Sequence, residues 1–207
     1  MTTPRDLLIV TMDVESGRPV EQGDLSLALA GAELIDLADA GAVVLDGDGI
    51  LPGDRVPLGE QGALGDHLLD EAAASVVREA PYESVEDWLW RRGRGLSAAY
   101  LAALTADGQV TRPRHQWIPF RDDAPALTDS PARRRAAGRW TSDEPVLAFL
   151  AAAVGVHEEP AEEAAGRVDD AVVTVLAAVN DAVRELEAVR QRRSIEEAAF
   201  DNIWRGQ

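Results

Sequence analysis

The sequence predicts a mainly α-helical, single-domain fold with one or two small β-hairpins. Three observations support this prediction: apolar residues recur at helical spacing along most of the chain, glycine-containing turns interrupt that spacing at a few places, and no cysteine is present. A length of 207 residues is typical of one domain and allows a sufficient core without disulfides. The expected core covers about residues 5–190 of the single domain 1–207, with a polar tail over 191–207.

Capping signals and apolar spacing define the expected helices. Asp24 precedes a run whose leucines fall near one side, and Gly41 follows that run as a typical C-terminal glycine. Ser84, with Asp87 three residues later, approximates a capping box. Valines and leucines at steps of three and four form an apolar stripe over 168–186. Helices are therefore expected at 24–40, 65–80, 84–93, 96–106, 131–139, 141–154 and 167–190, while residues 7–10 fit either a helix that begins near Thr3 or a buried strand.

Two segments predict β-structure. Residues 46–49, Asp-Gly-Asp-Gly, are typical of a tight hairpin turn between strands expected at 42–45 and 50–56. The same four residues resemble the start of a calcium-binding loop. The chain lacks the later ligands and the glutamate at the twelfth loop position, so we interpret them as a turn. Residues 110–120 predict two short β arms, most apolar at 117–120.

The charge is distributed unevenly along the chain. All 20 basic residues are arginines, and the formal net charge is −17. The segment 91–140 holds ten arginines and four aspartates, a local balance of +6, which leaves −23 for the remainder. Because salt screens exposed charges beyond about 8 Å, a local basic face can attract an anion despite the net charge. The alternative is that these arginines pair with acids elsewhere in the fold.

The residues that common catalytic sites require are absent or scattered. Without lysine or cysteine, the chain cannot supply a P-loop cation, a Schiff base, a thiolate nucleophile or a thiolate metal site. Its three histidines, His67, His115 and His157, lack metal-ligand spacing, and no serine-hydrolase elbow or dinucleotide fingerprint occurs. We therefore expect neither an enzyme nor a cofactor or metal site. The acidic remainder also argues against nucleic acid as a partner.

Hydropathy predicts no membrane span. The longest apolar stretch, residues 146–156, is about half the length that a span requires. The first residues lack the long apolar region and the cleavage site of a secretory signal. These features predict a cytoplasmic location.

Three blocks of the sequence resemble a known family in their order. Residues 29–41, LAGAELIDLADAG, are similar to the first helix of the Golgi phosphoprotein 3 family. Residues 65–72, GDHLLDEA, resemble that family's LLDEAL segment, and residues 85–89, VEDWL, its following V-x-x-W-[IL] segment. The resemblance extends over about residues 5–190. The arginine-only, alanine-rich composition suits a high-GC genome and an actinobacterial member.

The resemblance implies a helical domain that binds membranes peripherally. In eukaryotic members a basic pocket holds phosphatidylinositol 4-phosphate, and an amphipathic hairpin supports membrane contact and oligomer formation. At the four aligned pocket positions this chain has Glu21, Ala30, Arg94 and Ser97, so only Arg94 keeps the family's residue type. Loss of a tryptophan and two arginines removes stacking and charged hydrogen bonds to phosphate.

The combined observations lead to a functional prediction with two alternatives. We expect a non-enzymatic module that binds anionic phospholipid, with phosphatidylinositol 4-phosphate as the ligand that the resemblance implies, at the inner face of the cell membrane. The alternative is a cytoplasmic protein–protein scaffold that has lost phosphoinositide binding. Arginines clustered on one face favour the membrane, and arginines dispersed among acids favour the scaffold. The candidate headgroup residues are Arg94, Arg91, Arg92 and Arg18.

The expected hairpin carries a second set of candidates, which mixes aromatic and guanidinium groups. Such a mixture suits the headgroup region of a membrane. It also suits a subunit interface in a homo-oligomer, or a hairpin core in which the aromatic rings pack inward. These three interpretations remain open from the sequence. The candidates are Arg112, Arg114, Trp117, Phe120 and Arg121.

Overall fold

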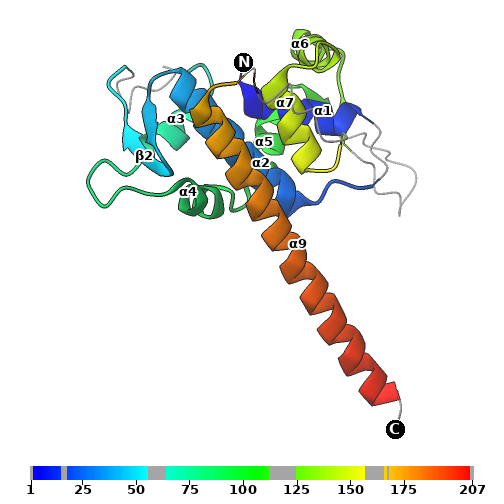
Figure 1. The fold of residues 1–207 in the computed structure, drawn as a ribbon. Coiled ribbons are helices and arrows are strands. Elements are labelled where there is room, and N and C mark those ends of the chain that lie inside the picture. The colour runs from blue at the N-terminus through cyan, green and yellow to red at the C-terminus, as the bar shows by residue number, and fades with distance from the viewer. Residues whose placement is uncertain are drawn as a thin grey trace.

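The computed structural model describes residues 2–14, 18–55, 64–111, 125–156, 166 and 168–205, with side chains up to Glu197. It confirms a mainly α-helical fold with two small antiparallel sheets of two strands each (Figure 1). The helices are α1 (Thr3–Asp13), α2 (Gln22–Asp39), α3 (His67–Ala74), α4 (Val85–Arg92), α5 (Leu96–Ala106), α6 (Pro131–Thr141), α7 (Pro145–Ala153) and α9 (Asp170–Arg205). The strands are β1 (Val43–Asp46), β2 (Gly49–Pro52), β3 (Val110–Thr111) and β4 (Ala126–Leu127).

Helix α2 forms the centre of the fold. It packs against α1, α4, α5, α7 and α9, and its residues from Leu25 to Ile35 are all buried. The leucines were expected near one side, but neighbouring helices surround α2, so alanines and Gly31 on its other sides are buried as well. A helix that is buried on all sides requires small or apolar residues around its whole circumference, and this sequence provides them.

Helix α9 covers α2 with the apolar stripe expected from the sequence. Val175 and Val179 are fully buried, and Val172, Ala182 and Val183 are less than a tenth exposed. The helix crosses the front of the body in Figure 1, and its C-terminal half runs away from it. The tail expected after residue 190 is therefore helical as far as Arg205.

The first hairpin forms at the predicted turn, but its second strand, expected over 50–56, ends at Pro52. β1 pairs with β2 in the register Val43 to Pro52 and Asp46 to Gly49, and Gly47 at the turn has a φ of +62°. The hairpin is attached to the chain before α4, since the amide of Ile50 donates to Glu83 and the amide of Val85 donates to Asp48. Among the predicted caps, the Ser84 hydroxyl accepts from the amide of Asp87 at 3.1 Å.

The structure decides one open alternative and corrects several predicted bounds. Helix α2 begins at Gln22, so Asp24 lies in its first turn and is not its N-cap. Residues 7–10 belong to α1 rather than to a strand, because helical packing against α2 satisfies their backbone while burying their side chains. The helix expected over 65–80 ends at Ala74. Strand β3 pairs with β4 rather than with a second arm inside 110–120, and residues 112–124 lie outside the described part of the chain.

We expect Gly31→Ala to destabilise the fold by about 1–3 kcal/mol, the usual range for overpacking a core. A Cβ atom at Gly31 would lie 2.3 Å from Cγ2 of Val179, so α9 has to shift away from α2. Urea unfolding measures the effect. Adding Val179→Ala to the variant vacates that space. The double variant should therefore lose less free energy of unfolding than the two single variants lose in sum. A fully additive pair would contradict this packing.

Candidate functional site

Most described arginines of the basic central segment form ion pairs with acids. Arg91 makes a two-pronged contact to Glu83, with Nε at 2.6 Å and Nη2 at 2.7 Å, and lies over the ring of Trp88. On α6, Arg133 pairs with Asp13, Arg134 with Asp129, Arg135 with Asp6, and Arg139 with Asp6 and Glu144. The +6 balance of this segment therefore does not translate into a separate basic face among these residues.

Arg92 belongs to a buried network rather than to the surface. Its Nε and Nη2 donate to Glu33 at 2.8 and 2.9 Å, and Nη2 also donates to the carbonyl of Leu68 at 2.8 Å. The hydroxyl of Tyr100 donates to the same carboxylate at 2.9 Å. Burial raises the pKa of Glu33, against the opposing effects of Arg92 and Tyr100. Burial likewise raises the pKa of Tyr100 far above its usual range, so the phenol remains a donor.

Arg94 lies in a different environment. It is exposed and forms no ion pair with the residues that the structure describes. It lines a hollow of about 330 Å³ between the start of α2, the α4–α5 turn and α9. The other lining residues are small or apolar apart from Gln22 and the two serines: Gln22, Gly23, Ser26, Leu27, Trp90, Gly93, Gly95, Ser97, Ala98 and Leu186.

Two helices begin at this hollow, which we call the Arg94 hollow. Helix α2 begins at Gln22 and α5 at Leu96, and neither has a side-chain cap, because the residues before them are Glu21 and the left-handed Gly95. The two beginnings are joined by serines, since Ser26 Oγ donates to Ser97 Oγ at 2.9 Å and accepts from the Ser97 amide at 3.1 Å. At the start of α5 the Leu96 amide already donates to Gly93 and the Ser97 amide to Ser26, whereas no side chain caps the first amides of α2. These α2 amides and the positive ends of the two helix dipoles favour an anion here.

The acids nearest the hollow are partly neutralised. Arg190 of α9 pairs with Asp24 and approaches Glu21 at 3.6 Å. Burial raises the pKa of Asp24, and the contact to Arg190 acts against that rise. An anion in the hollow would therefore meet Arg94 and two helix ends before it meets unpaired acids.

The structure separates the four candidate headgroup residues. Arg94 lines the hollow, Arg91 and Arg92 are held by Glu83 and Glu33, and Arg18 is exposed before α2 without lining the hollow. The other three positions aligned with the family's pocket do not all lie at the hollow. Ser97 lines the hollow, and Glu21 precedes Gln22 at its edge. Ala30 is fully buried, with its carbonyl accepting from the Trp88 indole at 3.1 Å.

Trp90 is a lining residue that the sequence reasoning missed. A signal was present: Trp88 and Trp90 are two residues apart, so they cannot occupy the same face of α4. Trp88 is fully buried, which leaves Trp90 on the side of the hollow, four residues before Arg94. The candidates Arg112, Arg114, Trp117, Phe120 and Arg121 lie outside the described residues.

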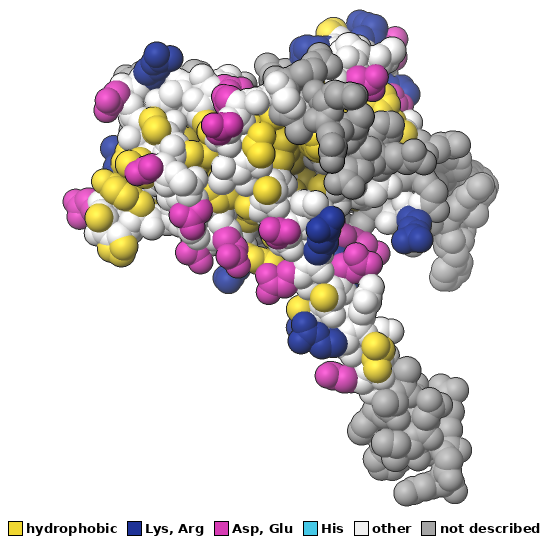
Figure 2. Space-filling view, viewed as in Figure 1, with side chains coloured by type: hydrophobic (Ala, Val, Ile, Leu, Met, Phe, Trp, Pro, Cys, Tyr) yellow, Lys and Arg dark blue, Asp and Glu magenta, His cyan; other side chains and the backbone are white. Residues whose placement is uncertain are grey.

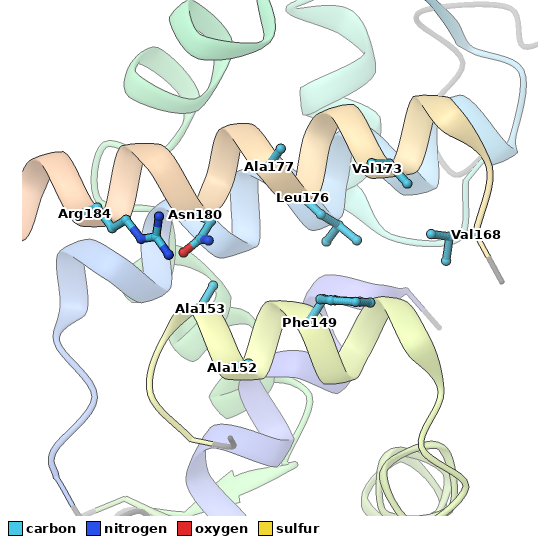
Figure 3. A pocket seen from close by; sticks show the side chains of 9 residues that line it. All are labelled: Phe149, Ala152, Ala153, Val168, Val173, Leu176, Ala177, Asn180 and Arg184. Carbon is cyan, nitrogen blue, oxygen red and sulfur yellow. The ribbon is translucent and has the colours of Figure 1, made fainter. Parts of the chain in front are cut away.

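A second cavity, of about 250 Å³, lies between α7 and α9 (Figure 3). Phe149, Ala152 and Ala153 line it from α7, and Leu176 lines it from α9, with Asn180 and Arg184 at one end. Residues 157–165 and 167, which connect the two helices, lie outside the described part of the chain. This cavity is mainly apolar, and none of the candidate headgroup arginines lines it.

A third hollow is acidic and cannot serve an anion. Asp48, Glu86, Asp181 and Glu185 line it, at the meeting point of the first hairpin, α4 and α9.

Within the described residues, no cluster of histidines and carboxylates is suited to holding a metal ion. Figure 2 shows one face of the molecule, on which the acidic and basic side chains of the described residues are interspersed without a separate basic patch. None of the described helices has the length and apolarity needed to cross a bilayer.

Comparison with known proteins identifies one related family. The family model of Golgi phosphoprotein 3 (GPP34) matches residues 4–192 of the chain. The matched region contains the described helices except for Thr3, the first residue of α1, and the last turns of α9. No curated protein matches the sequence.

We expect Arg92→Met to destabilise the protein by about 3–5 kcal/mol, because it leaves the fully buried Glu33 without its charged partner. For a chain of this size, the melting temperature should fall by roughly 10 °C. Arg134→Met is the matched control: its pair with Asp129 is exposed, so its effect should stay within about 0.5 kcal/mol. Equal melting temperatures for the two variants would contradict a structural role for Arg92.

Proposed function

Because the chain belongs to the Golgi phosphoprotein 3 family, we propose that it is a non-enzymatic module that binds anionic phospholipid. The Arg94 hollow receives the phosphate of the headgroup, and the protein acts peripherally at the inner face of the cell membrane. The observation that carries the proposal is the position of Arg94: it lies, without an ion-pair partner in the described part of the chain, where α2 and α5 both begin. Phosphatidylinositol 4-phosphate is the ligand suggested by family resemblance.

The chemistry of the hollow suits one phosphate group. A guanidinium donates two parallel hydrogen bonds to phosphate oxygens, and the uncapped amides at a helix start add further donors. Trp90 provides a flat apolar wall on which a headgroup ring or glycerol can lie. Among the described residues that line the hollow, Arg94 is the one guanidinium, and the nearby Arg190 is engaged with Asp24, so recognition of several phosphates at once has little support.

A protein–protein scaffold is the second candidate, and a specific observation favours it. Arg91, Arg92 and the arginines of α6 are dispersed among acids instead of gathered on one face. The net charge of −17 also opposes approach to an anionic surface at low salt. The scaffold candidate gains if the folded protein does not sediment with anionic vesicles at any lipid charge.

For the lipid proposal, we expect Arg94→Ser to weaken binding to anionic vesicles about fivefold or more, since one arginine at a membrane contributes about 1 kcal/mol. Co-sedimentation with vesicles of graded phosphatidylserine content measures the change. The control Arg134→Ser removes the same charge from an exposed pair on α6 and should leave binding within twofold, roughly 0.4 kcal/mol. Equal loss in both variants would indicate a general charge effect and would argue against the hollow.

We also expect little headgroup selectivity. Because Arg94 is the one guanidinium among the described lining residues, vesicles containing phosphatidylinositol 4-phosphate should bind less than about tenfold better than vesicles of equal charge made with phosphatidylserine, a difference below about 1.4 kcal/mol. Titrations with both vesicle types at one ionic strength test this. A larger preference would mean that other residues complete a phosphoinositide site, and Arg18→Ser would then be the first variant to examine.

A further inference from the structure

The cavity between α7 and α9, which we call the α7–α9 cavity, is apolar along most of its length. Phe149 and Ala152 line it from α7, Leu176 lines it from α9, and Val168 lines it just before α9 begins (Figure 3). All four side chains are only partly buried, and Val173, which also lines the cavity, is 41% exposed. The fold therefore leaves apolar surface uncovered between these two helices.

One end of the α7–α9 cavity is polar. Asn180 and Arg184 of α9 line this end, and Figure 3 shows both side chains directed toward Ala153 at the end of α7. Neither side chain forms a hydrogen bond or an ion pair with another described residue, and Arg184 is exposed. A guanidinium and an amide thus offer several N–H donors at one end of an apolar cavity.

These two features define a ligand by its chemistry. Apolar walls favour an aliphatic chain, and a guanidinium donates two parallel hydrogen bonds to a carboxylate. The volume of about 250 Å³ exceeds the roughly 150 Å³ that holds benzene, so a chain longer than a benzene ring fits. We therefore propose that the α7–α9 cavity binds a medium-chain fatty acid. Its carboxylate lies at Arg184 and Asn180, and its chain lies between the two helices.

Other occupants match the cavity less well. An inorganic anion pairs with Arg184 but leaves the apolar walls uncovered, and a neutral apolar molecule gains nothing from the guanidinium. A phospholipid has two long acyl chains, which exceed a cavity smaller than the roughly 300–1,000 Å³ of pockets for drug-sized ligands. The cavity shares no described lining residue with the Arg94 hollow, so this inference does not depend on the proposed function.

The test measures octanoate binding to the full-length chain by isothermal titration calorimetry. We expect a dissociation constant of about 1 mM or lower. From hexanoate to decanoate, affinity should rise by about two- to fourfold for each added CH₂ group until the cavity is filled. Octanol has the same number of carbons without the charge, and it should bind at least about fivefold more weakly.

Two variants separate the polar end of the cavity from its apolar walls. Arg184→Gln should weaken octanoate binding about fivefold or more and leave octanol binding unchanged. Its control is Arg192→Gln, an exposed arginine of α9 that does not line the cavity, which should leave octanoate binding within about twofold. Ala153→Phe fills the space beside Asn180 and should weaken binding of both ligands at least about tenfold.

Circular dichroism and thermal unfolding check the fold of each variant, and Arg184→Gln should keep it because Arg184 is exposed. A wild-type chain that binds no octanoate up to about 10 mM would overturn the proposal. Equal affinity for octanoate and octanol, or an Arg184→Gln variant that binds octanoate like the wild type, would do the same. Unchanged binding by Ala153→Phe would place the ligand on another surface and also reject the α7–α9 cavity.

Discussion

The buried carboxylate of Glu33 is the constraint on which much of the fold depends. A charge at a fully buried position of the central helix needs close partners, and it receives them from Arg92 of α4 and Tyr100 of α5. Arg92 also donates to the carbonyl of Leu68 in α3, so one network joins four helices. Because Arg92 faces inward, α4 is fixed about its own axis. Its end then reaches the surface at the Arg94 hollow.

The sequence predicted the local features well because their causes are local. The capping box at Ser84, the turn at residues 46–49 and the valine stripe of α9 each depend on neighbours within a few residues. The ion pairs were not predictable, because Arg92 and Glu33 are 59 residues apart and Arg133 and Asp13 are 120 apart. A count of charges along a segment gives no information on such partners. Within the candidate site, Arg94 was found from the sequence, whereas Trp90 and the two helix starts required the fold.

The charge of the molecule is more evenly compensated than its sequence suggests. An arginine that pairs with a buried acid stabilises the fold and is lost to a ligand, since breaking the pair leaves an uncompensated charge behind. Arg92, Arg139 and Arg5 are used in this way, toward Glu33, Asp6 and Asp66. Among the described arginines of the central segment, Arg94 therefore remains without an ion pair, in one small hollow rather than on a broad basic face.

Leu186 connects helix α9 to the Arg94 hollow, because it lines the hollow and packs, partly buried, against the core. Gly23 allows α9 to approach the start of α2 at this point, since a Cβ atom there would lie 2.7 Å from Leu186. The α9 wall of the hollow therefore depends on how closely α9 packs on α2, whereas Arg94 comes from the turn between α4 and α5. A larger residue at position 23 would displace Leu186 and change the shape of the hollow while leaving its guanidinium in place.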